Sequence, residues 1–198
     1  AAAPVLSDRN QFPTFSRVVP ADSHQGTALA SVCQHFGWDT LAIVATPDIY
    51  GTAASRAFAD AHTRRGGRVV EEIQLAYNLH SSDSEYGYSS ALAELRSSNA
   101  RVVALFTGSL DTTRAFLWHV GRAMLDDDLE FTFLGVDSWT DELLTSAPHA
   151  TNELLTALDG AIGTLPHLHR QGREYEAFLN AWSETPPVVN ELLRCDLG

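Results

Sequence analysis

The 198-residue sequence contains no lysine, so all 13 of its basic residues are arginine. Against 25 acidic residues they leave a formal net charge of −12, which argues against a partner with a phosphate backbone, such as a nucleic acid. The acidity suits a cationic or zwitterionic ligand, or simply solubility. Only two cysteines occur, Cys33 and Cys195, and they do not support a disulfide framework. We interpret Cys33 as a small buried hydrophobe.

The sequence also lacks the short motifs of common enzyme classes. It has no G-x-S-x-G, no P-loop, no G-x-G-x-x-G after a strand and no cysteine pair at metal-binding spacing. His167 and His169 have no acidic or cysteine partner at ligand spacing, and the acidic run 126–128 lacks the glycine and glutamate of a calcium loop. We therefore predict a protein that is not an enzyme and has no cofactor or metal, with 126–128 as a solvated turn.

No apolar run is long enough to span a bilayer, and the start AAAPVLSD shows none of the features of a signal peptide. We expect that such a peptide was removed or that the chain begins inside a longer protein. A hydrophobic content of 44% over 198 residues suffices for one large or two small domains with a real core.

The segment 12–50 is predicted to contain a polar turn, a helix, a strand and a second polar turn in succession. Residues 17–20 are predicted to be extended because Pro20 biases the preceding residue away from the helical region. Asp22 or Ser23 then caps a helix that ends at Gly37. Its apolar stripe consists of Leu29, Val32, Cys33 and Phe36.

The rest of the chain continues to alternate between strand and helix. Buried strands are predicted at 41–44, 68–75, 102–106, 131–136 and 161–165. A polar loop is predicted at 78–87, a helix ending near Asn99, and further helices around 117–124 and at 141–145, 152–157, 173–182 and beyond Pro186-Pro187. This order indicates an α/β fold, a doubly wound and mostly parallel sheet with helices on both faces.

Four polar side chains follow predicted extended segments: Asp22, Tyr50, Ser109 and Asp137. The carboxyl ends of parallel strands converge on one edge of the sheet, where ligands bind. Two carboxylates and a phenol ring at that edge can hold an ammonium group through charge-assisted hydrogen bonds and cation–π attraction. Structural alternatives stay open, with Asp22 and Asp137 as helix caps and Tyr50 as a packed aromatic.

Several segments resemble a known family: LSDRNQFPTFSRVVPADSHQGTALASVCQHFGW, AIVATPDIYG, RVVALF and FLGVDSWTDELL. They are similar to the receptor-type ligand-binding region, the two-lobed Venus-flytrap domain of class C G-protein-coupled receptors such as metabotropic glutamate receptors. The domain is of the type I periplasmic-binding-protein kind, and the resemblance covers about residues 6–165. It implies that Asp22 in V-P-x-D, Tyr50 in Y-G and Asp137 in G-x-D-x-W contact the ligand's ammonium group.

The resemblance also implies a domain organisation, since complete members of the family are about twice as long. Residues 1–19 correspond to the end of lobe one and the first hinge crossing, 20–163 to lobe two, and 164–198 to a segment that returns toward lobe one. Where glutamate receptors place a hydroxyl residue before L-S-D and an acidic residue after the strand 102–106, this chain has Ala2-Ala3 and Gly108. These departures favour recognition of an amino group by lobe two over recognition of a carboxylate by lobe one.

The function implied is the extracellular ligand-binding domain of a cell-surface receptor, which senses an amino acid or similar amine by clamshell closure. The membrane is then reached only through regions outside this chain, and a homodimer of the full receptor is one expectation. A soluble binding protein of an amino-acid transporter, periplasmic or secreted, is the alternative. An ectodomain that feeds a cyclase or kinase, or an enzyme on a doubly wound sheet, are further readings that the fold alone permits.

Overall fold

The computed structural model describes residues 3–75, 81–127, 129–136, 151–165 and 172–183. The chain divides into two compact units. The first, Ala1–Pro166, contains an α/β domain, and the second, His167–Gly198, contains the helix α8 (Arg173–Ser183). The expected division into lobes at residues 19 and 163 stays a prediction.

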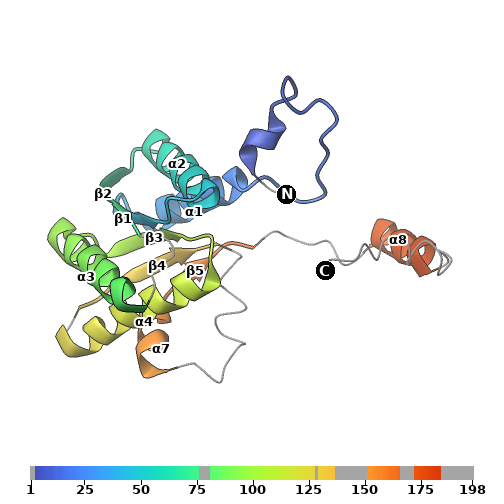
Figure 1. Ribbon diagram of the computed structural model, residues 1–198. Coiled ribbons are helices and arrows are strands. Elements are labelled where there is room, and N and C mark those ends of the chain that lie inside the picture. The colour runs from blue at the N-terminus through green and yellow to red at the C-terminus, as the bar shows by residue number, and fades with distance from the viewer. Residues whose placement is uncertain (1–2, 76–80, 128, 137–150, 166–171, 184–198) are drawn as a thin grey trace. The chain divides into compact units, whose positions relative to one another are not determined.

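The sheet of the first unit has five strands in the order β2-β1-β3-β4-β5 (Figure 1). The strands are β1 (Thr40–Ala45), β2 (Arg68–Gln74), β3 (Val102–Phe106), β4 (Thr132–Gly135) and β5 (Ile162–Gly163). All neighbouring pairs are parallel, which confirms the predicted architecture. The chain travels outward from β1 to β2, returns past β1 to β3, and then adds β4 and β5 on the other side. Its direction across the sheet therefore reverses between β1 and β3.

Helices cover both faces of this sheet (Figure 1). The helices are η1 (Pro4–Ser7), α1 (Ser23–Phe36), α2 (Ile49–Arg64), α3 (Ser81–Ser98), α4 (Leu110–Asp127) and α7 (Asn152–Leu158). α1 and α2 pack together on one face, while α3, α4 and α7 lie on the other. Right-handed crossovers explain this, because reversing the direction of travel across the sheet moves the connecting helices to the opposite face.

The core lies between the sheet and its helices. β3 is buried along its whole length, and Phe106 at its end packs against Phe58 of α2 with ring centroids 5.6 Å apart. On the other face Phe116 of α4 meets Phe133 of β4 edge-on at 6.4 Å. Cys33 is fully buried among these apolar side chains, in agreement with its interpretation as a small hydrophobe.

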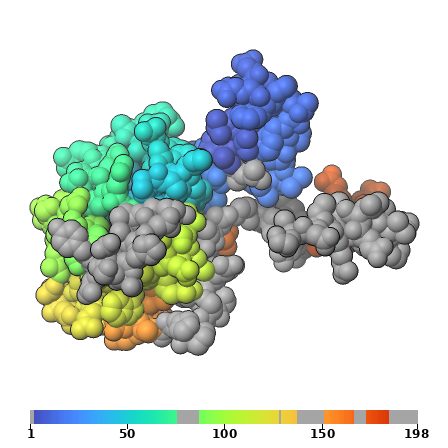
Figure 2. Space-filling model, viewed as in Figure 1, coloured from blue at the N-terminus to red at the C-terminus, as the bar shows by residue number. Residues whose placement is uncertain are grey.

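Two helices on the second face approach each other closely at a glycine. A Cβ atom on Gly121 of α4 would lie 1.8 Å from the carbonyl oxygen of Glu153 in α7. Leu154 and Ala157 of α7 are buried at this contact. In Figure 2 the yellow atoms of α4 and the orange atoms of α7 form one continuous surface.

The helix α1 follows the prediction at its start and end but not along its whole apolar stripe. Leu29 and Cys33 are buried, and Gly37 ends the helix in the left-handed conformation with φ of 69°. Phe36, however, is 53% exposed. Its ring stacks on Trp38 at 4.8 Å, so it finds an aromatic partner near the surface and not in the core.

The polar loop predicted at 78–87 is wrong from residue 81 onward, because α3 begins at Ser81. Its first two turns, SSDSEYG, carry no apolar periodicity, which is why the pattern indicated a loop. Serine and acidic residues are nevertheless typical of helix starts. The predicted end near Asn99 is confirmed, since that residue has a φ of 57° directly after the helix.

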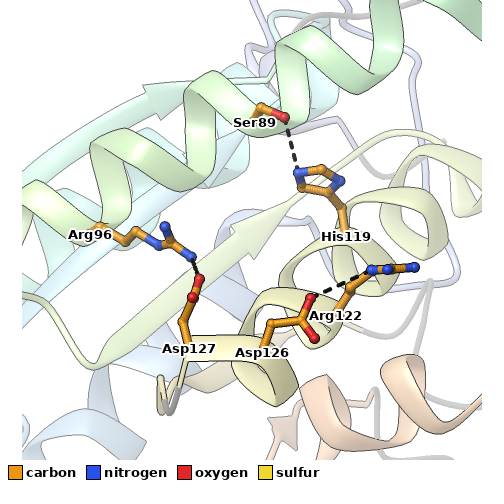
Figure 3. Close-up of polar contacts among 6 residues, drawn as sticks. All are labelled: Ser89, Arg96, His119, Arg122, Asp126 and Asp127. Atoms are coloured by element: carbon orange, nitrogen blue, oxygen red, sulfur yellow. Dashed lines mark hydrogen bonds and ion pairs between the residues drawn. The ribbon is translucent and has the colours of Figure 1, made fainter.

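The acidic run 126–128 is not a free turn, because Asp126 and Asp127 belong to the last turn of α4. Asp126 forms an ion pair with Arg122 at 3.6 Å, and Asp127 pairs with Arg96 of α3 (Figure 3). The hydroxyl of Ser89 in α3 also contacts a ring nitrogen of His119 in α4 (Figure 3), and the two atoms lie 3.2 Å apart. The contacts of Asp127 with Arg96 and of Ser89 with His119 tie α3 to α4, whereas the pair of Asp126 and Arg122 lies within α4. Asp128 lies outside the described residues.

Several predictions fall outside the described residues. They concern Asp137, the helix at 141–145, the histidines 167 and 169, Cys195 and the last short helix. Within the part of the chain that the structure describes, no helix is long and apolar enough to cross a membrane. The same part contains no group of three or more His, Cys, Asp or Glu side chains arranged to hold a metal ion.

Candidate ligand-binding site

The point where the strand order reverses is the natural place for a ligand in this fold. Loops that leave neighbouring strands in opposite directions open a crevice at their carboxyl ends. Here these are the loop 46–48 between β1 and α2 and the loop 107–109 between β3 and α4. Tyr50 and Ser109, two of the predicted site residues, stand at the starts of the helices α2 and α4.

Tyr50 is the second residue of α2, and its position is set by the cap of that helix. The side chain of Asp48 accepts a hydrogen bond from the backbone N–H of Gly51 at 2.9 Å. Tyr50 itself is half-buried and packs against the core. The packed-aromatic interpretation is therefore supported for much of the ring, while the residue remains at the sheet edge.

Ser109 directly precedes α4, and its hydrogen bonds hold the first turn of that helix. Its hydroxyl accepts a hydrogen bond from the N–H of Thr112 at 3.4 Å, and its carbonyl accepts from both the N–H and the hydroxyl of Thr113 at 3.0 and 2.9 Å. The Thr113 hydroxyl also meets that of Thr107. The loop after β3 is thus fastened to the first turn of α4, and the half-buried Ser109 is held in a fixed place.

Asp22 reaches the same edge for a reason other than the one predicted. Residues 17–20 bend at Val18 and Val19, both exposed, and belong to no strand among the described residues. Asp22 occupies the predicted N-cap position of α1, which confirms that position, but it has helical backbone angles and its side chain makes no capping hydrogen bond. Because α1 leads into β1, it runs antiparallel to the strands, and its start lies on the side of their carboxyl ends.

Asp137 lies outside the described residues and stays a prediction. It follows β4 and the buried Val136, so its place in the sequence corresponds to the carboxyl end of a third strand. The structure brings Tyr50 and Ser109 to neighbouring loops at the strand reversal.

Three residues at this edge were not among the predicted site residues: Thr46, Asp48 and Gly108. The hydroxyl of Thr46 donates to the carboxylate of Asp48 and accepts a hydrogen bond from the N–H of Gly108 at 3.1 Å. A polar residue at the end of a buried strand and an aspartate three residues before Gly51 were visible signals. The link to Gly108 was not, since it joins positions 62 residues apart.

The edge is negatively charged in its described part. Asp22 and Asp48 are half-buried, and Asp111 in the first turn of α4 is exposed. Asp111 forms an ion pair with Arg114 of the same helix, with 3.7 Å between the guanidinium nitrogen and the carboxylate oxygen. A surface of this kind attracts a cationic group more than a free carboxylate.

A separate pocket of about 110 Å³ lies in the N-terminal segment. It is lined by Leu6, Ser7, Arg9, Phe15 and Arg17. The guanidinium of Arg17 sits 5.2 Å from the centre of the Phe15 ring and donates to the hydroxyl of Ser7 at 2.9 Å. These contacts fasten the turns that precede α1.

Comparison with known proteins agrees with a ligand-binding domain. A family model described as "Receptor family ligand binding region" matches residues 1–191. The chain is 28% identical to metabotropic glutamate receptor 8 of Homo sapiens over 167 residues, which are 84% of this chain and 17% of that receptor. It is 26% identical to metabotropic glutamate receptor 6 of Oryctolagus cuniculus over 172 residues, 86% of this chain and 18% of the receptor. The chain thus spans less than a fifth of the length of these relatives.

Proposed function

Because the chain belongs to the family of receptor ligand binding regions, we propose that its sheet edge at β1 and β3 binds the ammonium group of an amino acid or a similar small amine. The observation that carries the proposal is the position of Tyr50 and Ser109. Each begins a helix at one of the two strands that flank the reversal of strand order, where this class of sheet binds ligands.

The chemistry of the edge supports an amine. A phenol ring attracts a cation over its face, and carboxylates form charge-assisted hydrogen bonds with an ammonium group. In the proposal Tyr50 supplies the ring, Asp22 and Asp137 the carboxylates, and Ser109 a hydroxyl. The relatives are named metabotropic glutamate receptors, which makes an α-amino acid the ligand class to test first.

The proposed mechanism is closure of two lobes around the ligand. A ligand shifts such an equilibrium only by the difference between its affinities for the open and the closed state. The ammonium contacts of this edge would contribute to that difference when the facing lobe meets the same ligand. We place the chain on the extracellular side of a membrane receptor, where it binds its ligand without turning it over.

A titration followed by NMR of the ¹⁵N-labelled chain tests the proposal. Glutamate and other amino acids are compared with glutarate, which keeps the carboxylates of glutamate but lacks the amine. One edge alone should bind weakly, with a Kd of about 1 mM, or about 4 kcal/mol. We expect the amide signals of residues 46, 48–51 and 108–110 to shift with amino acids and not with glutarate. The absence of shifts at tens of millimolar would refute the proposal.

A Tyr50→Phe variant is a matched control for the cation–π part. It keeps the ring and loses the hydroxyl, so amine binding should persist, whereas Tyr50→Leu should weaken it. Equal affinity in the wild type and in Tyr50→Leu would show that the ring does not face the ligand.

A further inference from the structure

Four residues join the two loops at the strand reversal. Asp48 accepts hydrogen bonds from the N–H of Gly51, at 2.9 Å, and from the hydroxyl of Thr46. Thr46 accepts in turn from the N–H of Gly108 at 3.1 Å. We call this set, Thr46, Asp48, Gly51 and Gly108, the Asp48 brace. It runs from the first turn of α2 across β1 to the loop after β3.

The backbone is shaped around this brace. A Cβ atom on Gly51 would lie 2.2 Å from the carbonyl oxygen of Thr46, and one on Gly108 would lie 2.9 Å from the Asp48 carboxylate. The carboxylate of Asp48 therefore occupies the space that a side chain at position 108 would need. Both glycines allow approaches that no other residue permits without movement.

The central residue of the brace, Thr46, is buried. Thr46 is only 1% exposed, and its N–H donates to the carbonyl of Phe106 at 3.0 Å. Its buried hydroxyl thus donates to the half-buried Asp48 and accepts from the N–H of Gly108. Hydrogen bonds in such surroundings are costly to lose, because water does not replace the missing partner.

Tyr50 and Ser109 lie at the two ends of the brace. Tyr50 directly precedes Gly51 in the turn that Asp48 caps, and Ser109 directly follows Gly108. We infer that Asp48, acting through Thr46, is a positioning residue that holds Tyr50 and Ser109 as one rigid half of the binding site. This inference rests on the proposed function, since it assigns the brace to the same edge.

Two variants separate the link between the loops from the capping of α2. Thr46→Val keeps the shape of the side chain and removes its hydroxyl, while Thr46→Ser restores the hydroxyl. Asp48→Ser retains a side-chain oxygen that caps the helix, but this side chain is too short to reach Thr46 as well. It tests the link between the loops if Thr46→Val fails to fold. The matched control is Ser98→Ala. Like the hydroxyl of Thr46, the hydroxyl of Ser98 donates one hydrogen bond and accepts one from a backbone N–H. Its acceptor is the carbonyl of Leu95 and its donor is Ala100, at the other end of the sheet.

The first measurement uses no ligand and follows amide signals and hydrogen exchange in the full chain. We expect Thr46→Val to shift the signals of residues 50, 51, 108 and 109 together and to speed exchange at Gly108. Ser98→Ala should move none of them, and Thr46→Ser should restore them. Changes confined to residue 46 and its strand neighbours would overturn the inference.

The second measurement is the amino-acid titration. Thr46→Val and Asp48→Ser should weaken binding about fivefold, the effect of one lost hydrogen bond, while Ser98→Ala lowers stability without changing the Kd. If the wild type binds and Thr46→Val binds equally well, the positioning role is wrong. If the wild type binds no amino acid while the ligand-free shifts occur as expected, the proposed function fails and the coupling of the two loops stands.

Discussion

Replacing Gly121 by alanine adds a single methyl group where α4 and α7 touch. That methyl would lie 1.8 Å from the carbonyl oxygen and 2.6 Å from the carbonyl carbon of Glu153. Both are backbone atoms, so no side-chain rotation relieves the overlap. One of the two helices has to move outward by more than an ångström before the contact reaches a normal separation.

The free energy of unfolding then has two opposing contributions. Alanine in place of glycine favours a helix by about 1 kcal/mol. Overpacking costs about 1–3 kcal/mol, and the upper end applies here because the backbone itself must shift. Moving α7 also uncovers part of Leu154, whose full burial contributes about 2 kcal/mol. We therefore expect Gly121→Ala to destabilise the first unit by about 2 kcal/mol.

Thermal and urea unfolding monitored by circular dichroism measure this effect. A loss of that size lowers the midpoint by about 4–8 °C in a domain of this length. Gly26→Ala is the graded control, because its methyl would approach the N atom of Phe58 at 2.8 Å, a milder overlap, and should cost about 1 kcal/mol less. If Gly121→Ala is as stable as the wild type, or gains the helix-propensity term, the packing of α7 on α4 is wrong.

Three further predictions concern single side chains. Burial lowers the pKa of His62 below its usual 6.5, against the hydrogen bond with the Asp39 carbonyl, so its neutral form is favoured by folding. The stabilisation is complete above pH 6.5 and declines as pH falls through the lower folded pKa, and His62→Gln should flatten this part of the stability–pH curve. Thr151→Ala removes the hydroxyl that caps α7 and should cost about 1 kcal/mol in urea unfolding. Burial raises the pKa of the Cys33 thiol to about 11, so in Cys195→Ser protein a thiol reagent should modify it only after unfolding.

Much of the fold could be predicted from local patterns. The strand at 102–106 was predicted to the residue, because five consecutive apolar side chains with polar residues on both sides are typical of a buried parallel strand. The start of α3 was missed for the opposite reason. Its first two turns offer no apolar face, so their helical state depends on the apolar turns later in the same helix and not on their own periodicity.

The candidate site was only partly predictable. Tyr50 and Ser109 lie at the predicted edge of the sheet because strand order and polarity suffice to locate the carboxyl edge of a parallel sheet, and their contact with a ligand stays a prediction. The hydrogen bond between Thr46 and Gly108 depends on the pairing of β1 with β3, a long-range contact that no local pattern encodes. Asp22 was predicted to lie at this edge because residues 17–20 were expected to be extended, but that segment bends. Asp22 lies there because α1 runs antiparallel to the strands and begins at their carboxyl ends.

The strand order also has a consequence for how the chain folds as it is made. β2 is available to pair with β1 first, but the other side of β1 waits for β3, whose Phe106 pairs with Ala45. At about 5–20 residues per second, the ribosome needs roughly 3–12 seconds to make the intervening sixty residues. During that interval one side of an apolar strand stands open to pairing with another chain. Nascent molecules of this protein should therefore depend on chaperones most between the synthesis of β1 and that of β3.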